Sequence, residues 1–382
     1  MRVMARWRRR NVAAGGMLAL GRGAVERYGA QRMFPHRLAS IFACIILGIG
    51  ITLAGVGCST APHDAVPRRL LAQLEERSQD ASTLGMTMRG SEVDVRVEQT
   101  GNRGVLAVEM KHLLGLPAMT LHVNEEPVTV AVDTGSQGCL VLDAATAVKV
   151  NLDVLRHEPD KFKLEGTMGS EPAILAQARR VEVGSWRMQG LPCLVRTHRS
   201  MSGGRFNRRH VTLDVWGMAL LLQSCTYLTL DYPANKILFG FDQSYQPVRG
   251  THAWKSPLTL RDGLPYVQVS SRGVRWEALL DTGANSALEI TRDAARRAGL
   301  LEYVREIEGE RFGVGVSQSS TRDRIQVVTL PEVSGIGPAM QDIPAFVVSD
   351  GAKVGSAFLS PYRVTLDFRK NVVWLESGAK SR

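Results

Sequence analysis

Two stretches of the chain alternate apolar and polar residues in the way that half-buried β-strands do. The first stretch covers residues 117–133 and the second covers residues 265–281. A short polar turn divides each stretch into two arms, at residues 124–127 in the first and 271–273 in the second. This period of two predicts a β-hairpin in each half of the chain.

The two hairpins carry the same landmarks at the same spacing. Each ends on Asp-Thr-Gly, at residues 133–135 and 281–283, and a Gly-Leu-Pro tripeptide begins 18 residues before each aspartate. Matched spacing of two rare tripeptides is typical of an internal repeat. The pattern predicts a duplicated unit that presents one carboxylate per half.

Segments further along each half also correspond. Residues 228–232 and 364–368 are apolar runs that end in Asp-Tyr and Asp-Phe, and each precedes a turn and another apolar strand. Upstream lie Val215-Trp216-Gly217 in the first half and Lys353-Val354-Gly355 in the second, where only the middle residue is apolar. The alternative is that two unrelated hairpins share turn chemistry, and three ordered landmarks favour the repeat.

These patterns predict an all-β chain built as two similar lobes, with short helices at residues 144–150 and 292–298. The expected organisation is a leader over 1–58, a tether with a short helix over 59–102, a first lobe over 103–245, a connection over 246–256 and a second lobe over 257–377.

The two loops resemble the active-site loops of aspartic proteases, with Asp-Thr-Gly-Ser at 133–136 and Asp-Thr-Gly-Ala at 281–284. The short lobes are similar to the retropepsin-like branch, and the single-chain, two-lobed layout is similar to pepsin. The resemblance implies two retropepsin-like β-barrel lobes related by duplication, with an active-site cleft between them.

The resemblance also implies roles for the loop residues. Asp133 and Asp281 would share one proton and activate a water. Loop-supporting roles would fall to Thr134, Gly135, Ser136, Thr282, Gly283 and Ala284. Ser136 brings a hydroxyl near its aspartate and Ala284 brings none, so the two carboxyls are expected to differ in proton affinity, in an order that the sequence leaves open.

An aspartic protease also needs a flexible hairpin to cover its cleft. Glycine-bearing stretches lie between each aspartate loop and the later apolar-Gly segment. The flap candidates are Gly166, Gly169, Gly313 and Gly315. The alternative for each is an ordinary surface turn.

The first 58 residues have the composition of a targeting segment. They hold nine arginines, no lysine and one glutamate, so +8 of the net charge of +10 falls there. An apolar run over 38–57 follows the basic flank and ends at Cys58, and Met33 is the expected start of translation. Because little net charge remains in the rest of the chain, no nucleic-acid partner is expected.

Cys58 follows small residues and resembles a bacterial lipoprotein processing site, which would anchor the protein at the periplasm-facing cell envelope. Ordinary cleavage to a secreted form and an uncleaved membrane anchor remain as alternatives. Cys139, Cys193 and Cys225 allow at most one disulfide, and the sequence leaves its pairing open. A catalytic role for the Cys139 thiol lacks a positioned base.

The histidines show no metal-binding spacing, so neither a metal nor a cofactor is expected. The sequence therefore predicts an aspartic endopeptidase that acts on peptides or proteins as a monomer, because each half supplies one aspartate. The alternative is a catalytically silent module on the same fold that binds peptides or envelope components. The sequence leaves open whether residues 59–102 act as a prosegment.

Overall fold

The computed structural model describes residues 66–89, 92–95, 97–156, 162–166, 169–197, 213–308, 324–349 and 351–378, all within one compact unit. The leader, Cys58, Gly313 and Gly315 lie outside the described residues. The described part is mostly β, with a few short helices, which confirms the expectation of an all-β chain.

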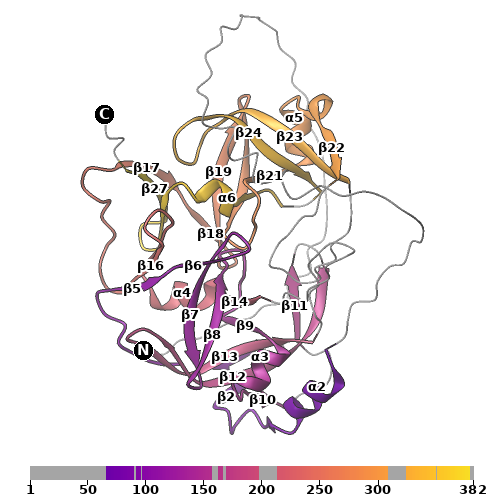
Figure 1. Cartoon of the computed structure of the whole chain (residues 1–382), viewed down its shortest axis with the longest axis vertical. Helices are drawn as coiled ribbons and strands as arrows, with labels where there is room; N and C mark the ends of the chain where they lie inside the picture. Colours follow the sequence, from indigo (N-terminus) through magenta and orange to yellow (C-terminus); the bar gives the residue numbers. More distant parts are fainter. Residues whose placement is uncertain are drawn as a thin grey trace, which may run out of the picture. The chain divides into compact units, whose positions relative to one another are not determined.

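Both predicted hairpins are present (Figure 1). Strands β7 (Leu116–Val123) and β8 (Glu126–Val132) form the first, and β19 (Leu264–Ser271) and β20 (Val274–Asp281) form the second. Both turn residues have positive φ in each hairpin, at Asn124 and Glu125 and at Arg272 and Gly273. Such two-residue turns match the twist of the strands, so the local sequence determines the hairpins.

The first hairpin lies in an 11-stranded sheet, whose strands run in the order β1-β10-β12-β13-β9-β14-β8-β7-β6, with β11 beside β12 and β4 beside β13. The strands not yet given are β1 (Ser78–Gln79), β4 (Glu98–Thr100), β6 (Lys111–Leu113), β9 (Leu140–Asp143), β10 (Asp153–Leu155), β11 (Phe162–Gly166), β12 (Gly169–Val183), β13 (Trp186–Arg196) and β14 (Asp214–Trp216).

The second hairpin lies in an eight-stranded sheet of order β18-β19-β20-β25-β21-β24-β23-β22. Its other strands are β18 (Thr259–Arg261), β21 (Leu288–Thr291), β22 (Arg305–Glu308), β23 (Arg324–Val333), β24 (Met340–Val348) and β25 (Lys353–Gly355). From β18 to β23, this order matches the first sheet read backwards from its β6 edge, β6-β7-β8-β14-β9-β13-β12. The match includes the parallel pairs, β8–β14 in the first sheet and β20–β25 in the second. The two sheets thus share one topology over these strands.

A third, six-stranded sheet combines strands from both halves of the chain, in the order β17-β27-β26-β15-β16-β5. Its strands are β5 (Val105–Glu109), β15 (Tyr227–Asp231), β16 (Lys236–Gly240), β17 (His252–Pro257), β26 (Arg363–Asp367) and β27 (Val372–Ser377). At its centre β15 and β26 pair antiparallel, with Thr229 opposite Thr365. The hairpin strands predicted at the end of each half are therefore present, whereas all of β17 except Pro257 falls in the connection expected over 246–256.

Short helices follow the aspartate loops and precede the last strands of each half. They are α3 (Ala144–Lys149), α4 (Met218–Ser224), α5 (Arg292–Arg297), α6 (Ser356–Leu359) and the 3₁₀ turn η1 (Leu301–Tyr303). Asp143 caps α3 and Thr291 caps α5, each by accepting a backbone N–H with its side chain. Helices α3 and α5 confirm the two short helices expected after the aspartate loops.

The segment before the first hairpin is more structured than its sequence pattern predicts. The expected short helix is α2 (Arg68–Glu75), but the segment also forms β1, β4 and a hairpin of β2 (Met86–Arg89) and β3 (Glu92–Val95). Strand β1 pairs with β10, and β4 pairs with β13. Leu74 and Leu84 are buried in the same core as the first sheet, which ties this segment to the protein body.

Candidate active site

The two aspartates of the repeat lie at the ends of equivalent strands. Asp133 follows β8 directly and Asp281 is the last residue of β20. Asp133 and Asp281 are only 4% and 5% exposed. Burying two carboxyls is unfavourable unless other groups stabilise them, so the loops around them should be built for that purpose.

The backbone of each loop supplies the first of these groups. The Gly135 N–H donates to Asp133 Oδ1 over 2.7 Å, and the Gly283 N–H donates to Asp281 Oδ1 over 2.9 Å. Each glycine also makes room for the opposite aspartate. A Cβ on Gly135 would lie 2.5 Å from Asp281 Oδ1, and one on Gly283 would lie 2.4 Å from the carboxyl carbon of Asp133. The two carboxyls therefore face each other across the paired loops, each against the other's glycine.

The threonines join the two loops through four buried hydrogen bonds. The Thr134 N–H donates to Thr282 Oγ1 and the Thr282 N–H donates to Thr134 Oγ1, each over 3.0 Å. The Thr134 hydroxyl in turn donates to the Leu280 carbonyl, and the Thr282 hydroxyl donates to the Val132 carbonyl, each at a distance of 2.5 Å. This reciprocal arrangement fixes the two aspartate loops relative to each other.

Ser136 and Ala284, the fourth residues of the two motifs, hold their loops to the following apolar-Gly segments. The N–H of Met218 donates to the Ser136 carbonyl, and the N–H of Ser356 donates to the Ala284 carbonyl, both over 2.8 Å. In addition, the Ser356 hydroxyl donates to the Thr282 carbonyl over 2.7 Å. The backbone support is therefore alike in the two halves.

A lysine that the sequence analysis did not assign to the site lies beside the second aspartate. Lys353 Nζ is 2.7 Å from Asp281 Oδ2, and the two side chains are 13% and 7% exposed. Lys353 occupies the first position of β25, where the matching segment of the first half has the apolar Val215. The only sign in the sequence was this polar residue in an otherwise apolar segment.

Burial and charge have different effects on the ionisable groups of the site. Burial raises the pKa of Asp133 well above its usual value, and the charge of Asp281 raises it further, against the Gly135 N–H and Lys353, which lower it. For Lys353, burial acts to lower the pKa, but the carboxylates of Asp281 and Glu289 outweigh it, so the net shift is upward. The site thus favours a neutral Asp133 and a charged Lys353.

The flap candidates are described in part. Gly166 and Gly169 face each other at the end of the β11–β12 hairpin. They therefore lie at a hairpin tip.

The three cysteines in the described part of the chain form no disulfide. Cys139, Cys193 and Cys225 are free and buried. Burial raises the pKa of the Cys139 thiol to about 12, which argues against its acting as a nucleophile.

Two other features, a metal site and a membrane-spanning helix, are absent from the described residues. No cluster of three or more metal-ligating side chains occurs in that part of the chain. None of its helices has the length and apolar character needed to cross a membrane.

Comparison with known proteins relates part of the chain to a protein family. Residues 119–208 match a family model described as aspartyl protease. This segment contains the Asp133 loop and strands up to β13, and it ends before the Asp281 loop. No curated protein matches the chain. The match supports an aspartic protease family, and with it a protease function in general.

Proposed function

We propose that the chain is an aspartic endopeptidase in which Asp133 and Asp281 form the catalytic pair. The observation that carries the proposal is the mutual fit of the two loops, where each aspartate occupies the space left by the other loop's glycine. The four hydrogen bonds that Thr134 and Thr282 make across the two loops support it, because they hold two carboxyls at a separation that surface turns would not maintain. The family match over 119–208 supports the same class of enzyme.

The proposed chemistry needs one ionised and one neutral carboxyl. Two carboxyls this close share a proton, because ionising both is unfavourable. The ionised partner removes a proton from a bound water as that water attacks the peptide carbonyl. The neutral partner donates a hydrogen bond to the developing oxyanion, and the proton that the base took from the water then passes to the nitrogen of the leaving amine.

The finer features of the resemblance belong to this proposal. The repeated strand order and the central pairing of β15 with β26 support two retropepsin-like lobes that arose by duplication. A substrate cleft would lie between these lobes, over the aspartates, and the β11–β12 hairpin would cover it. Because each half supplies one aspartate, a monomer suffices and no cofactor is required.

The cellular setting is proposed from the leader alone. A basic flank, an apolar run and Cys58 suit a bacterial protein that is held at the envelope by a lipid and faces the periplasm. The substrate would then be a peptide or a protein of that compartment.

The test uses the full-length chain in detergent, incubated with a diverse peptide mixture from acidic to neutral pH. Cut sites are read by mass spectrometry for the wild type and for Asp133→Asn, Asp281→Asn and Asp293→Asn. Asp293 is a matched control, since its side chain is 68% exposed on α5 and pairs with Arg296 and Arg297 of the same helix. We expect cuts in the wild type and the control, and none in the other two variants.

Other outcomes would contradict the proposal. Undiminished cleavage by Asp281→Asn would exclude the shared-proton mechanism. Binding of a transition-state-like peptide inhibitor by a folded wild type that makes no cuts at any pH would favour the silent binding module.

A further inference from the structure

The Lys353 side chain reaches Asp281 from the neighbouring strand. Strand β25 runs parallel to β20 and pairs Lys353 with Leu279, two residues before the aspartate. From there Nζ contacts Asp281 Oδ2, while Oδ1 of the same carboxyl accepts the Gly283 N–H. Both oxygens of Asp281 therefore have a donor that stabilises negative charge.

Among the described residues of the first half, no cation reaches the aspartate from the equivalent strand. The residue at the same register of β14 is Val215, which pairs with Ala131, two residues before Asp133. Val215 is buried and apolar, so it gives nothing to Asp133. The asymmetry between the two halves is therefore larger than the difference between Ser136 and Ala284 suggests.

Four ionisable groups face Lys353 from the elements around it. Asp281 is on β20, Glu289 pairs with Lys353 on β21, Asp133 is on the loop after β8, and Tyr266 is on β19. Glu289 is buried and accepts a hydrogen bond from Ser286 over 3.2 Å. Both Glu289 and Asp281 interact with the charge of Lys353. Glu289 therefore weakens the effect of Lys353 on the catalytic pair.

A cation in contact with one of two coupled carboxyls decides where their shared proton resides. The charge is most stable on the carboxyl that contacts the ammonium, and the proton is most stable on the other one. A buried ion pair of this kind is weakly screened by solvent, so the preference holds at ordinary salt concentration.

We propose, building on the proposed protease function, that Lys353 is a positioning residue that keeps Asp281 ionised as the base and leaves the shared proton on Asp133. As a consequence, the enzyme works at lower pH than the same pair of aspartates would without the lysine.

The direction of the pH effect follows from charge alone. Lys353 favours loss of each proton from the pair, so it lowers both the pH at which the singly protonated form appears and the pH at which it disappears. Removing the lysine moves both limbs of the pH–rate profile upward. An opposite charge at this distance typically changes a carboxyl pKa by about 1–3 units, so we expect a shift of at least about one pH unit.

The first experiment measures kcat/KM against pH for the full-length wild type and three variants. Lys353→Met removes the charge at similar length and should move both limbs upward. Glu289→Gln frees the lysine from a competing carboxylate and should move both limbs downward. Lys353→Arg keeps the charge and should restore the wild-type limbs. Unshifted limbs in both Lys353→Met and Glu289→Gln would overturn the proposal, because a merely structural lysine would change the rate without moving the limbs.

A second measurement needs no turnover. Carboxyl ¹³C NMR titration of aspartate-labelled protein, assigned with Asp133→Asn and Asp281→Asn, follows the two groups directly. We expect Asp281 to lose its proton before Asp133 in the wild type, and both to titrate at higher pH in Lys353→Met. The reverse order in the wild type would overturn the proposal.

The two measurements also separate failure of this inference from failure of the proposed function. If the wild type cleaves peptides but its limbs do not respond to Lys353, the protease stands and the role of the lysine falls. If no peptide is cleaved but the NMR titration gives the expected order, the charge assignment stands and the proteolytic function falls.

Discussion

The threonines of the two aspartate loops carry the clearest stability prediction at the level of single residues. Thr134→Val removes the donor to the Leu280 carbonyl and the acceptor of the Thr282 N–H while keeping the side-chain shape. Leaving such buried groups without partners costs about 1–3 kcal/mol. Urea unfolding should show this loss. The control is Thr129→Val on β8, which removes a half-buried hydroxyl and should cost no more than about 0.5 kcal/mol. Equal losses would mean that the bonds between the loops add little.

Because the pKa of Asp133 is raised, we expect the stability of Asp133→Asn relative to the wild type to increase as pH rises. Its native carboxyl holds the proton more tightly than the unfolded one, whose pKa is near 3.8. Between the unfolded and the folded pKa the wild type therefore loses about 1.4 kcal/mol per pH unit as pH increases. Asp133→Asn lacks this loss, so its stability advantage over the wild type should grow from about pH 4 upward. Urea unfolding over a pH series measures the difference.

Asp214 allows the same prediction to be made over a defined pH range. Burial raises the pKa of Asp214 to about 6, against the hydrogen bonds from the Asp143 N–H and the Thr146 hydroxyl. The advantage of Asp214→Asn should therefore grow between about pH 4 and pH 6 and level off above that. A stability difference that shrinks with rising pH, for either variant, would contradict the assigned direction of the pKa shift.

The aspartates could be predicted from the sequence, whereas the lysine could not. Asp133 and Asp281 stand in a repeated tripeptide at the end of a period-two pattern, and both signals are local. Lys353 acts on Asp281 only because β25 pairs in parallel with β20, a strand some 70 residues earlier in the chain. The sequence shows that an apolar residue is missing at this position, but not which group the lysine faces.

At the level of elements, the hairpins and the short helices follow from local rules. Turn residues with positive φ, and the caps Asp143 and Thr291, specify them within a few residues. The strands that the sequence did not predict include β1, β4 and β17. These are short edge or joining strands, and distant partners such as β10, β13 and β27 determine them.

The glycines that end β25 and precede α4 are expected to tolerate no side chain. A Cβ on Gly355 would lie 2.2 Å from the Ser286 carbonyl oxygen, and one on Gly217 would lie 2.4 Å from that of Gly138. Both obstacles are backbone, so relief requires moving the aspartate loop itself. Gly355→Ala should therefore cost about 3 kcal/mol or more, and it should reduce cleavage by displacing the Asp281 loop.

The matched control for this prediction is Gly378→Ala. Within the described part of the chain, no atom lies within 4 Å of a Cβ at that position, so the change should leave stability and cleavage nearly unaffected. Thermal unfolding and peptide cleavage are measured for both variants. If Gly355→Ala behaved like the control, the loop and the apolar-Gly segment would not be in rigid contact.

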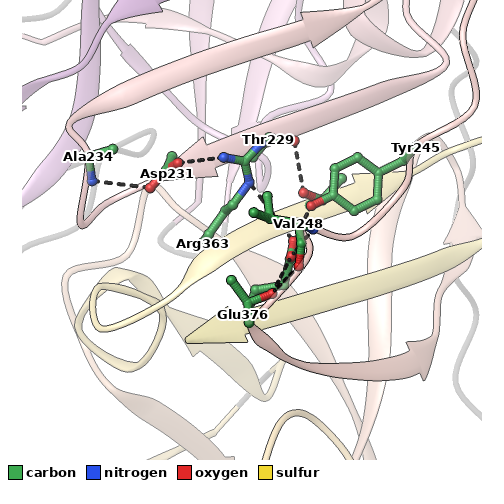
Figure 2. A network of polar contacts seen from close by, with 9 residues as sticks. Thr229, Asp231, Ala234, Tyr245, Val248, Arg363 and Glu376 are labelled. Atoms are coloured by element: carbon green, nitrogen blue, oxygen red, sulfur yellow. Dashed lines mark hydrogen bonds and ion pairs between the residues drawn. The ribbon is translucent and has the colours of Figure 1, made fainter. Parts of the chain in front are cut away.

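At the level of the whole molecule, the six-stranded sheet joins the two halves of the chain that supply the aspartates. Figure 2 shows the polar network of this sheet, in which Arg363 contacts Asp231, and Tyr245 donates to the buried Glu376. Glu376 also accepts hydrogen bonds from the Val248 N–H and the Thr251 hydroxyl. This carboxylate therefore has several donors, as burial of its charge requires. Strands from both halves thus depend on one set of contacts.

A chain of hydroxyl groups crosses the centre of this sheet. Thr229 and Thr365 lie opposite each other, fully buried, with 2.8 Å between their hydroxyl oxygens. Burial raises the pKa of Tyr245 to about 12 and its bond to Glu376 contributes, while a hydrogen bond from Thr365 lowers it. Thr365 is thus the middle member, with Thr229 on one side and Tyr245 on the other.

The position of Thr365 predicts unequal effects of two identical substitutions. Thr365→Val removes a partner from both neighbours and should cost about 1–3 kcal/mol, while Thr229→Val, its matched control across the pair, should cost less. The double variant should cost less than the two single losses combined, because it removes both members of the Thr229–Thr365 bond, and Tyr245 keeps its bond to Glu376. Urea unfolding followed by tryptophan fluorescence and by circular dichroism measures all three.

Because strands from both halves pair at this sheet, the two signals should change in one transition in every variant. Additive losses would mean that the two threonines are not coupled through a shared bond. Two separate transitions in the wild type would mean that the halves fold independently and that this sheet does not fix one aspartate loop relative to the other.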